Sequence, residues 1–209
     1  MSEGKNEMSW GFSNELFPDC AHMCLIFDSE EQRRKIVSQY LDAGFRQGEF
    51  VRYLTDKTSP EDVRSWLLEM GVELPEAGGS GSFGIFKADS VYCPNGHFDP
   101  REMIKGMLLS YDKAKKGGYR GTRSCGEMTW ALKGIPGSDR LFEYEALIST
   151  ITETYPHKGM CMYDARLFDG ATLLNVLKVH PYMVAQEQIV RNPFYVRPEE
   201  FLEELKSSQ

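Results

Sequence analysis

The sequence of 209 residues lacks any stretch that could place it in a membrane. No run approaches the roughly 20 consecutive apolar residues that a membrane-spanning helix needs. The first seven residues are polar, without the apolar core of a signal peptide. We therefore expect a cytoplasmic protein that does not bind membranes.

The motifs of several large enzyme classes are also missing. The sequence contains no G-x-x-x-x-G-K-[ST] phosphate loop, no H-E-x-x-H zinc motif and no G-x-S-x-G nucleophile elbow. A thiol nucleophile needs an adjacent base, and nothing in the sequence brings Cys125 next to one of the four histidines. We expect no catalytic residues and a protein that is not an enzyme.

Positive charge is scarce: 24 Lys and Arg stand against 31 Asp and Glu, which gives a net charge of −7. The densest basic patch, residues 113–116, lies at the end of a predicted helix, where it complements the helix dipole. Because phosphate neutralisation needs clustered Lys and Arg, we expect no direct nucleic-acid binding. Five cysteines, an odd number in a reducing compartment, argue against a disulfide framework.

The first recognisable feature of the sequence is a strand–helix–strand unit over residues 22–55. The apolar run 23–27 predicts a buried strand, and Ser29 is a suitable N-cap for the helix that follows. In such units, ligands bind at the carboxyl ends of the strands. This junction carries Asp28, Glu30 and Glu31 in place of a phosphate loop. An acidic junction repels phosphate, so the unit predicts a nucleotide-binding architecture without a conventional nucleotide site.

Strands alternate with helices along the whole chain. The predicted strands are residues 23–27, 50–55, 83–88, 119–125 and 158–164, followed by a hairpin over 182–190. Short connections between alternating elements predict an α/β three-layer sandwich with a mainly parallel central sheet. We divide the chain into an N-terminal extension (1–19), one domain (20–197) and a C-terminal helix (198–209).

Short motifs in a fixed order connect the sequence with a known family. They run from residue 22 to residue 195: His22-x-Cys-Leu-Ile-Phe-Asp-Ser-Glu-Glu31, Gly48-Glu49, Gly96-x-Phe-Asp-Pro100, Gly118-Tyr-Arg-Gly121, Gly126-Glu-Met-Thr-Trp-Ala-Leu132, Glu143-Tyr-Glu145, Cys161-x-Tyr-Asp164, His180-Pro181 and Asn192-Pro-Phe-Tyr195. In these motifs the chain resembles the MEDS domain, the sensory domain of methanogens, methylotrophs and the dichloromethane-responsive repressor.

The resemblance implies a RecA-like, P-loop-NTPase-type topology, related to circadian-clock ATPases, that has lost its P-loop. It also implies a domain that senses small molecules, often fused to DNA-binding or signalling domains. This chain has no recognisable output domain. We therefore expect a stand-alone sensor that signals through a protein partner such as a regulator or a kinase.

Six residues are predicted to line a ligand crevice at the carboxyl ends of the strands: Asp28, Arg123, Glu127, Trp130, Tyr163 and Asp164. Glu127 and Asp28, on what we expect to be adjacent strand ends, could bind a cation or a polar ligand. An equally weighted alternative is that Arg123 and Glu127 pair with other charges and close the crevice. For the aromatic residues, ordinary core packing is the alternative to a pocket wall.

A second cluster, Cys20, His22 and Cys24, has metal-ligand residue types. A structural zinc site needs four ligands, and no C-x-x-C motif completes this one. The fold would have to recruit a further ligand, with His157, Cys161, Cys93 or His97 as candidates. Buried small side chains are the simpler interpretation of these cysteines. We predict no metal site, and the sequence leaves the identity of any cofactor unknown.

The leading hypothesis is therefore a small-molecule sensor whose ligand is a small organic compound. Ligand binding would reposition the loop over residues 78–82 or the terminal segments. One alternative is a ligand-free interaction module that associates, as a homodimer or with another protein, through its apolar N-terminal segment and its C-terminal helix. Another is a residual nucleotide binder.

Overall fold

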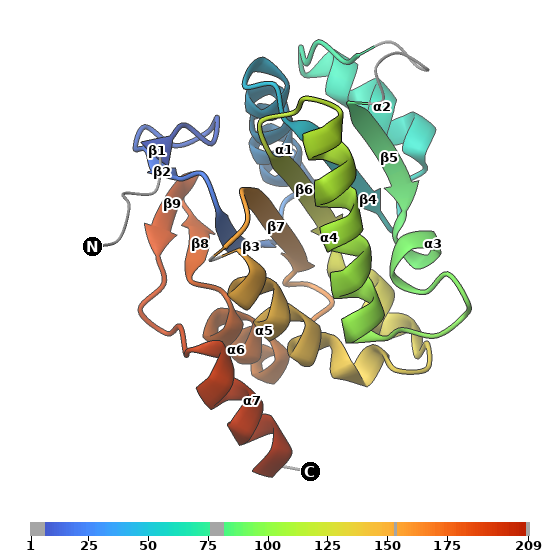
Figure 1. The fold of residues 1–209 in the computed structure, drawn as a ribbon, viewed down its shortest axis with the longest axis vertical. Coiled ribbons are helices and arrows are strands. Elements are labelled where there is room, and N and C mark those ends of the chain that lie inside the picture. Colours follow the sequence, from blue (N-terminus) through green and yellow to red (C-terminus); the bar gives the residue numbers. More distant parts are fainter. Residues whose placement is uncertain (1–6, 76–81, 153, 208–209) are drawn as a thin grey trace.

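A seven-stranded sheet forms the centre of the computed structural model, which describes residues 7–75, 82–152 and 154–207 (Figure 1). The first six strands of the sheet are parallel, and the last pairs antiparallel to its neighbour. In spatial order they are β5 (Phe83–Lys87), β4 (Phe50–Thr55), β6 (Thr122–Glu127), β7 (His157–Asp164), β3 (Ala21–Phe27), β8 (Tyr182–Ala185) and β9 (Gln188–Arg191). The predicted mainly parallel α/β sheet is thus confirmed.

Helices cover both faces of this sheet. One face packs against α1 (Glu30–Arg46) and α2 (Pro60–Glu69). The other face packs against α4 (Pro100–Lys116), α5 (Leu141–Ile151) and α6 (Gly170–Val179) (Figure 1). Short elements complete the described chain: β1 (Glu7–Met8), β2 (Phe17–Pro18), α3 (Ala88–Tyr92), the 3₁₀ helices η1 (Met128–Lys133) and η2 (Ser138–Arg140), and α7 (Pro198–Ser207).

Side chains alternate along the strands and so divide the core into two. Met23 and Leu25 of β3 point to the α1 face, whereas His22 and Cys24 point to the α5 face. β7 is buried at every position, because parallel strands in the middle of a sheet are covered on both faces. The same rule places Arg123 and Glu127 on the α1 face of β6, and Ser124 and Gly126 on the α4 face.

The start of β6 differs from the predicted strand 119–125. Tyr119 continues the termination of α4, where its amide donates to the carbonyl of Ala114, and Gly118 adopts a left-handed φ of 82°. The strand therefore begins three residues later, at Thr122. This shift moves Arg123 from the predicted carboxyl end of the strand to its amino end.

Both terminal segments pack on the domain. Trp10 is buried beside Tyr40 of α1, with ring centroids 5.9 Å apart. Phe201 of α7 is buried against Ala146 of α5 and Val179 of α6. Most of the loop at 78–82 lies outside the described residues. Among the residues that are described, no helix combines the length and apolar character needed to cross a bilayer.

Candidate functional site

The carboxyl ends of the strands are organised around the carboxylate of Glu127. Its Oε1 accepts hydrogen bonds from the hydroxyl of Tyr53 (2.7 Å) and from Nη1 of Arg33 (3.1 Å). Its Oε2 accepts from the backbone amides of Asp56 (2.7 Å) and Lys57 (3.1 Å). The side chain is nearly fully buried. Glu127 therefore fixes the β4–α2 connection to β6 and to α1.

Further ion pairs extend from Glu127 across the rim. Arg33 also pairs with Glu30 at 2.7 Å, and Glu30 pairs with Arg166 at 3.2 Å. Arg166 in turn contacts Asp164 at 2.8 Å, and its hydrogen bonds hold the pKa of that carboxyl below its usual value. A smaller pocket of about 290 Å³ remains here, beside Arg33 and Glu127. Arg33 and Arg166 are paired with carboxylates, whereas Arg34 and Lys57, which also line this pocket, form no ion pair with the described residues.

The six predicted site residues do not form one cluster. Asp28 is exposed after β3, and β7 lies between β3 and β6, so Asp28 and Glu127 are not on adjacent strands as predicted. Asp164 does lie at the rim, at the end of β7. Arg123 lies at the opposite end of the sheet, where it pairs with Glu49. The predicted alternative, pairing of Arg123 and Glu127 with other charges, describes the observed contacts of both side chains.

Trp130 and Tyr163 belong to the core on the other face of the sheet. The Trp130 ring stacks on Tyr92 with centroids 4.7 Å apart, and it is fully buried. Tyr163 donates its hydroxyl proton to Glu145 of α5. Neither aromatic side chain lines the larger cavity, so core packing accounts for both.

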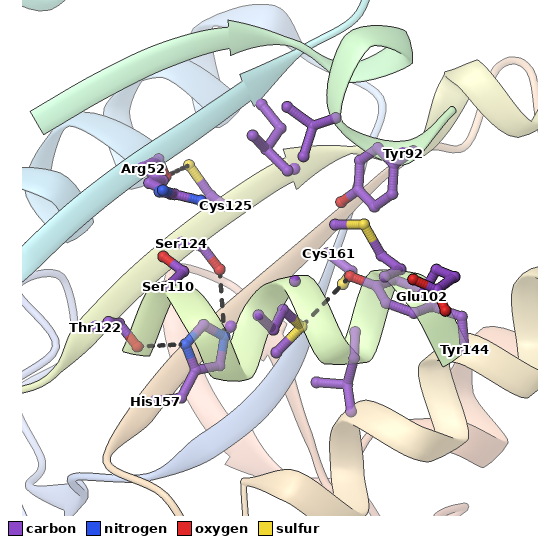
Figure 2. Close-up of a pocket in the computed structure, with 18 of the residues that line it drawn as sticks. Arg52, Tyr92, Glu102, Ser110, Thr122, Ser124, Cys125, Tyr144, His157 and Cys161 are labelled. Carbon is purple, nitrogen blue, oxygen red and sulfur yellow. Dashed lines mark hydrogen bonds between the residues drawn. The ribbon is translucent and has the colours of Figure 1, made fainter. Parts of the chain in front are cut away.

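That larger cavity, of about 480 Å³, lies between α4 and the sheet (Figure 2). Its volume falls in the range of about 300–1,000 Å³ that is usual for small-molecule sites. β4, β6 and β7 form the floor, α4 forms the roof, and α5 with the segment after α3 closes the sides. The apolar part of the wall includes Leu54, Val91, Met103, Met107 and Ile148.

Small residues on the strands keep this space open. Ser124, Gly126 and Gly159 occupy floor positions where the sheet elsewhere carries large side chains. A Cβ atom at Gly126 would come within 2.5 Å of the Tyr92 hydroxyl. Gly106 keeps space open at the roof of the cavity, because α4 carries no side chain at that position. The sequence shows these small residues, but only the register of the strands places them opposite α4.

The polar groups of the cavity converge on His157. Its Nδ1 lies 2.7 Å from the Thr122 hydroxyl and its Nε2 lies 3.3 Å from the Ser124 hydroxyl (Figure 2). Burial, helped by the nearby His22, lowers the pKa of His157 to about 3. The imidazole is therefore neutral at physiological pH. Together with Ser110 on α4, it offers hydrogen bonds to a ligand, and Arg52 of β4 supplies a positive charge to this wall (Figure 2).

The N-terminus of α4, at the mouth of the cavity, depends on Asp99. Asp99 Oδ1 accepts from the amides of Arg101 (2.8 Å) and Glu102 (3.1 Å), and Oδ2 accepts from Arg140 (3.1 Å). The amide of Glu102 contributes most to lowering the pKa of Asp99, with further contributions from the amide of Arg101 and the side chain of Arg140. This carboxylate is the N-cap that the sequence predicts.

We expect Asp99→Ala to lower the unfolding free energy by about 1 kcal/mol, because it leaves amides at the start of α4 without an acceptor. Asp99→Asn, which retains a capping oxygen, should cost less. Because the native pKa of Asp99 is lowered, its contribution is present above the unfolded value of about 3.9 and is lost as the pH falls through the native value. Denaturant unfolding from about pH 5 to about pH 3 should show the advantage of wild type over Asp99→Asn shrink. A constant advantage would contradict this assignment.

A second polar cluster lies behind the cavity, on the α5 face of the sheet. His22 of β3, Glu145 of α5, Cys161 of β7 and His180 after α6 each offer one ligand atom, and these four atoms lie within 4.8 Å of one another. Of the predicted group Cys20, His22 and Cys24, only His22 belongs to this cluster. Cys161 is one of the residues that the sequence analysis gives as a possible further metal ligand. Glu145 and His180 are not predicted as ligands, and in the sequence they stand out only as members of the family motifs.

The comparisons with known proteins agree with this architecture. Residues 21–181 match the family model described as MEDS, the methanogen/methylotroph, DcmR sensory domain. The transcriptional repressor DcmR of Methylorubrum extorquens is 24% identical over 160 residues, which are 76% of this chain and 57% of the repressor. The chain therefore matches little more than half of the length of that relative.

Two solved structures share the fold. The KaiC-like protein PH0186 of Pyrococcus horikoshii superposes with a TM-score of 0.61 at 12% identity, over 86% of this chain and 80% of that one. The flagellar accessory protein FlaH of Methanocaldococcus jannaschii gives a TM-score of 0.54 at 8% identity, over 81% and 74% of the two chains. At these identities the likeness concerns the fold alone, and it confirms the predicted RecA-like topology. The family model matches residues 21–181, which are most of this chain, so the chain belongs to the MEDS family of sensory domains.

Proposed function

We propose that this chain senses a small and largely apolar organic molecule, which binds in the cavity between α4 and the sheet. The observation that carries the proposal is the cavity itself: about 480 Å³, apolar walls, and a few convergent hydrogen-bonding groups around His157. This is the usual composition of a small-molecule site. Family membership supports a sensory role, and the ligand is inferred from the cavity's chemistry.

The cavity wall offers one cation to a ligand. His157 is neutral because its pKa is about 3. Arg52 of β4 lines the cavity without an ion pair among the described residues, and its Nε is buried with no hydrogen-bond partner there. Asp99 and Glu102 at the mouth would repel an anion, and Asp99 already pairs with Arg140. An alcohol, ketone or carboxylate oxygen would accept a hydrogen bond from the Arg52 guanidinium, whereas a polyphosphate would need more cations than the one that Arg52 supplies. A thiol or haloalkane would need only the apolar wall.

We assign binding, not catalysis, to this site. Burial, reinforced by Glu145, raises the pKa of the Cys161 thiol well above its usual value, so the reactive thiolate is scarce. Both ring nitrogens of His157 are engaged by hydroxyls. An interaction module without a ligand is less well supported, because Trp10, Phe17 and Phe201 are buried against the chain's own domain.

Signal output would pass through α4, which forms the roof of the cavity. α4 contacts α5, and α5 contacts α7. A ligand that changes the position of α4 would alter the surface that these helices present to a protein partner. We propose that this partner is a regulator or a kinase.

A melting-shift screen with paired α4 variants tests the proposed site. The panel contains short alcohols, ketones, thiols, haloalkanes and carboxylic acids, with ATP and Mg²⁺ as a separate arm. A compound that binds the native state should raise the melting temperature of the wild type by mass action, equivalent to about 2.7 kcal/mol at 100 times its Kd. Gly106→Phe, which adds a ring at the roof of the cavity, should abolish this shift.

Two control variants separate blocked binding from damaged folding. Gly106→Ala leaves the cavity open, and as an alanine within a helix it should raise stability by up to about 1 kcal/mol. Leu109→Phe adds a ring on the exposed side of α4, away from the cavity. Both should keep the ligand shift. Equal shifts in Gly106→Phe and wild type would place the ligand elsewhere, and a shift with ATP alone would favour the nucleotide alternative.

A further inference from the structure

Four buried side chains from distant parts of the sequence meet behind the cavity. The Nε2 atom of His22 lies 3.1 Å from Oε2 of Glu145 and 3.3 Å from Sγ of Cys161. The same Oε2 lies 3.3 Å from Sγ of Cys161 and 3.5 Å from Nε2 of His180. His22, Glu145 and His180 are fully buried, and Cys161 is 6% exposed.

The outer hydrogen bonds of the two histidines fix which nitrogen carries the proton. Ser149 donates its hydroxyl proton to the carbonyl of Val179 (2.8 Å), so it can only accept from Nδ1 of His22 (2.9 Å). Nδ1 of His180 lies 2.7 Å from the carbonyl of Val176, which can only accept. In its neutral form, each imidazole therefore keeps its proton on Nδ1 and turns a lone pair on Nε2 toward Glu145.

This arrangement leaves too few protons for the groups that face each other. Two Nε2 lone pairs and one carboxylate oxygen converge, and the Cys161 thiol supplies one proton between them. His180 Nε2 is buried without any hydrogen-bond partner in the described chain. Facing lone pairs in a dry interior repel one another and cost several kcal/mol if they are left unsatisfied. A cation at the centre would satisfy all four groups at once.

The geometry points to a divalent transition-metal site, with Zn²⁺ as the fitting ion, held by His22, Glu145, Cys161 and His180. Zn²⁺ bonds of about 2.0–2.3 Å to nitrogen, oxygen and sulfur place the ligands of a tetrahedron about 3.3–3.6 Å apart. Four of the six distances between the ligand atoms are 3.1 to 3.5 Å, close to these values, and the other two are at most 4.8 Å. On binding, the Cys161 thiol releases its proton and coordinates as thiolate.

The surrounding contacts are those of a built metal site. Metal-binding histidines usually donate their other N–H to a fixed acceptor, as His22 does to Ser149 and His180 does to Val176. Tyr163 donates to the second oxygen of Glu145 and so orients the carboxylate. The site joins β3, α5, β7 and the end of α6. His22 and Cys161 also line the cavity, so the metal lies in its inner wall, whatever molecule the cavity binds.

Cobalt substitution of the intact chain tests this site. After chelation and dialysis, Co²⁺ should bind with a stoichiometry of one per chain and give a thiolate-to-cobalt charge-transfer band that Zn²⁺ abolishes. Cys161→Ser should lose the band. Cys125→Ser, which changes another fully buried cysteine on the α1 face, should keep it. No band in the wild type, or a band that survives in Cys161→Ser, would overturn the assignment.

A second measurement needs no variant and therefore does not depend on the folding of Cys161→Ser. X-ray absorption at the zinc edge of the Zn²⁺-loaded wild type should show one sulfur at about 2.3 Å with three nitrogen or oxygen scatterers at about 2.0–2.2 Å. Scattering from nitrogen and oxygen alone would overturn the proposal. The cluster would then be held by protons, with an imidazolium paired to Glu145.

Discussion

Glu49→Gln is expected to lower the unfolding free energy by about 3–5 kcal/mol, because the change leaves two buried cations without their counter-charge. Glu49 lies just before β4 and pairs with Arg123 of β6 and Lys158 of β7. The side chains of all three residues are at most 2% exposed. Arg123 keeps its bond to the carbonyl of Tyr40 (2.7 Å) in the variant, but Lys158 loses its carboxylate partner. Denaturant unfolding at pH 7 measures the difference.

The deficit of Glu49→Gln should also depend on pH. Burial lowers the pKa of Lys158, while Glu49 acts in the opposite direction and Arg123 adds to the lowering. Without Glu49 the native pKa falls further below the unfolded value of about 10.4, so the unfolded state binds more protons. The variant should therefore recover stability relative to wild type as the pH rises from about 7 to about 10.

Glu73→Gln is the matched control for this prediction. Glu73 is exposed in the turn after α2, and its substitution should change the unfolding free energy by less than about 0.5 kcal/mol at any pH. A deficit for Glu49→Gln no larger than that of the control would mean that Arg123 and Lys158 find other partners.

Glu127→Gln should cost about 3 kcal/mol, because an amide cannot replace a carboxylate that accepts from four donors. The two backbone amides on Oε2 and the Tyr53 and Arg33 donors on Oε1 all need an acceptor. Whichever way the glutamine is turned, its NH₂ group faces at least one of these donor pairs. Thermal and denaturant unfolding both report the loss.

Two further variants separate the burial of Glu127 from the pairing of Arg33. Glu30→Gln removes the other carboxylate on Arg33, but Glu30 is half exposed, so the cost should stay below about 1 kcal/mol. Tyr53→Phe removes one donor to Glu127 and should cost about 1 kcal/mol. If Glu127→Gln cost no more than Glu30→Gln, the carboxylate would not be the organising group of the rim. Ligand shifts in the α4 cavity should persist in folded Glu127→Gln.

Local features of the sequence were enough to predict the elements and the fold class. Ser29, Ser59 and Asp99 cap α1, α2 and α4 as predicted, because a capping side chain bonds amides only two or three residues away. The order of strands and helices, the missing phosphate loop and the family motifs could be read in the same way. These features lie within single elements or their immediate connections.

The strand order and register, in contrast, were decided only by the tertiary structure. Because β7 enters between β6 and β3, Asp28 and Glu127 are separated. The later start of β6 carries Arg123 to Glu49, at the other end of the sheet. The ligand crevice predicted from six residues of the sequence remains a prediction. In the structure those six residues lie in three different places.

The cavity and the His22–Glu145–Cys161–His180 cluster depend on the same non-local information. Ser124, Gly126 and Gly159 make a cavity only because neighbouring strands align them under α4. Residues 22, 145, 161 and 180 meet only because α5 crosses the sheet where β3 and β7 are paired. Sequence spacing records which side chains share a face of one strand or helix. It does not record which faces meet, because that depends on the packing of the whole core.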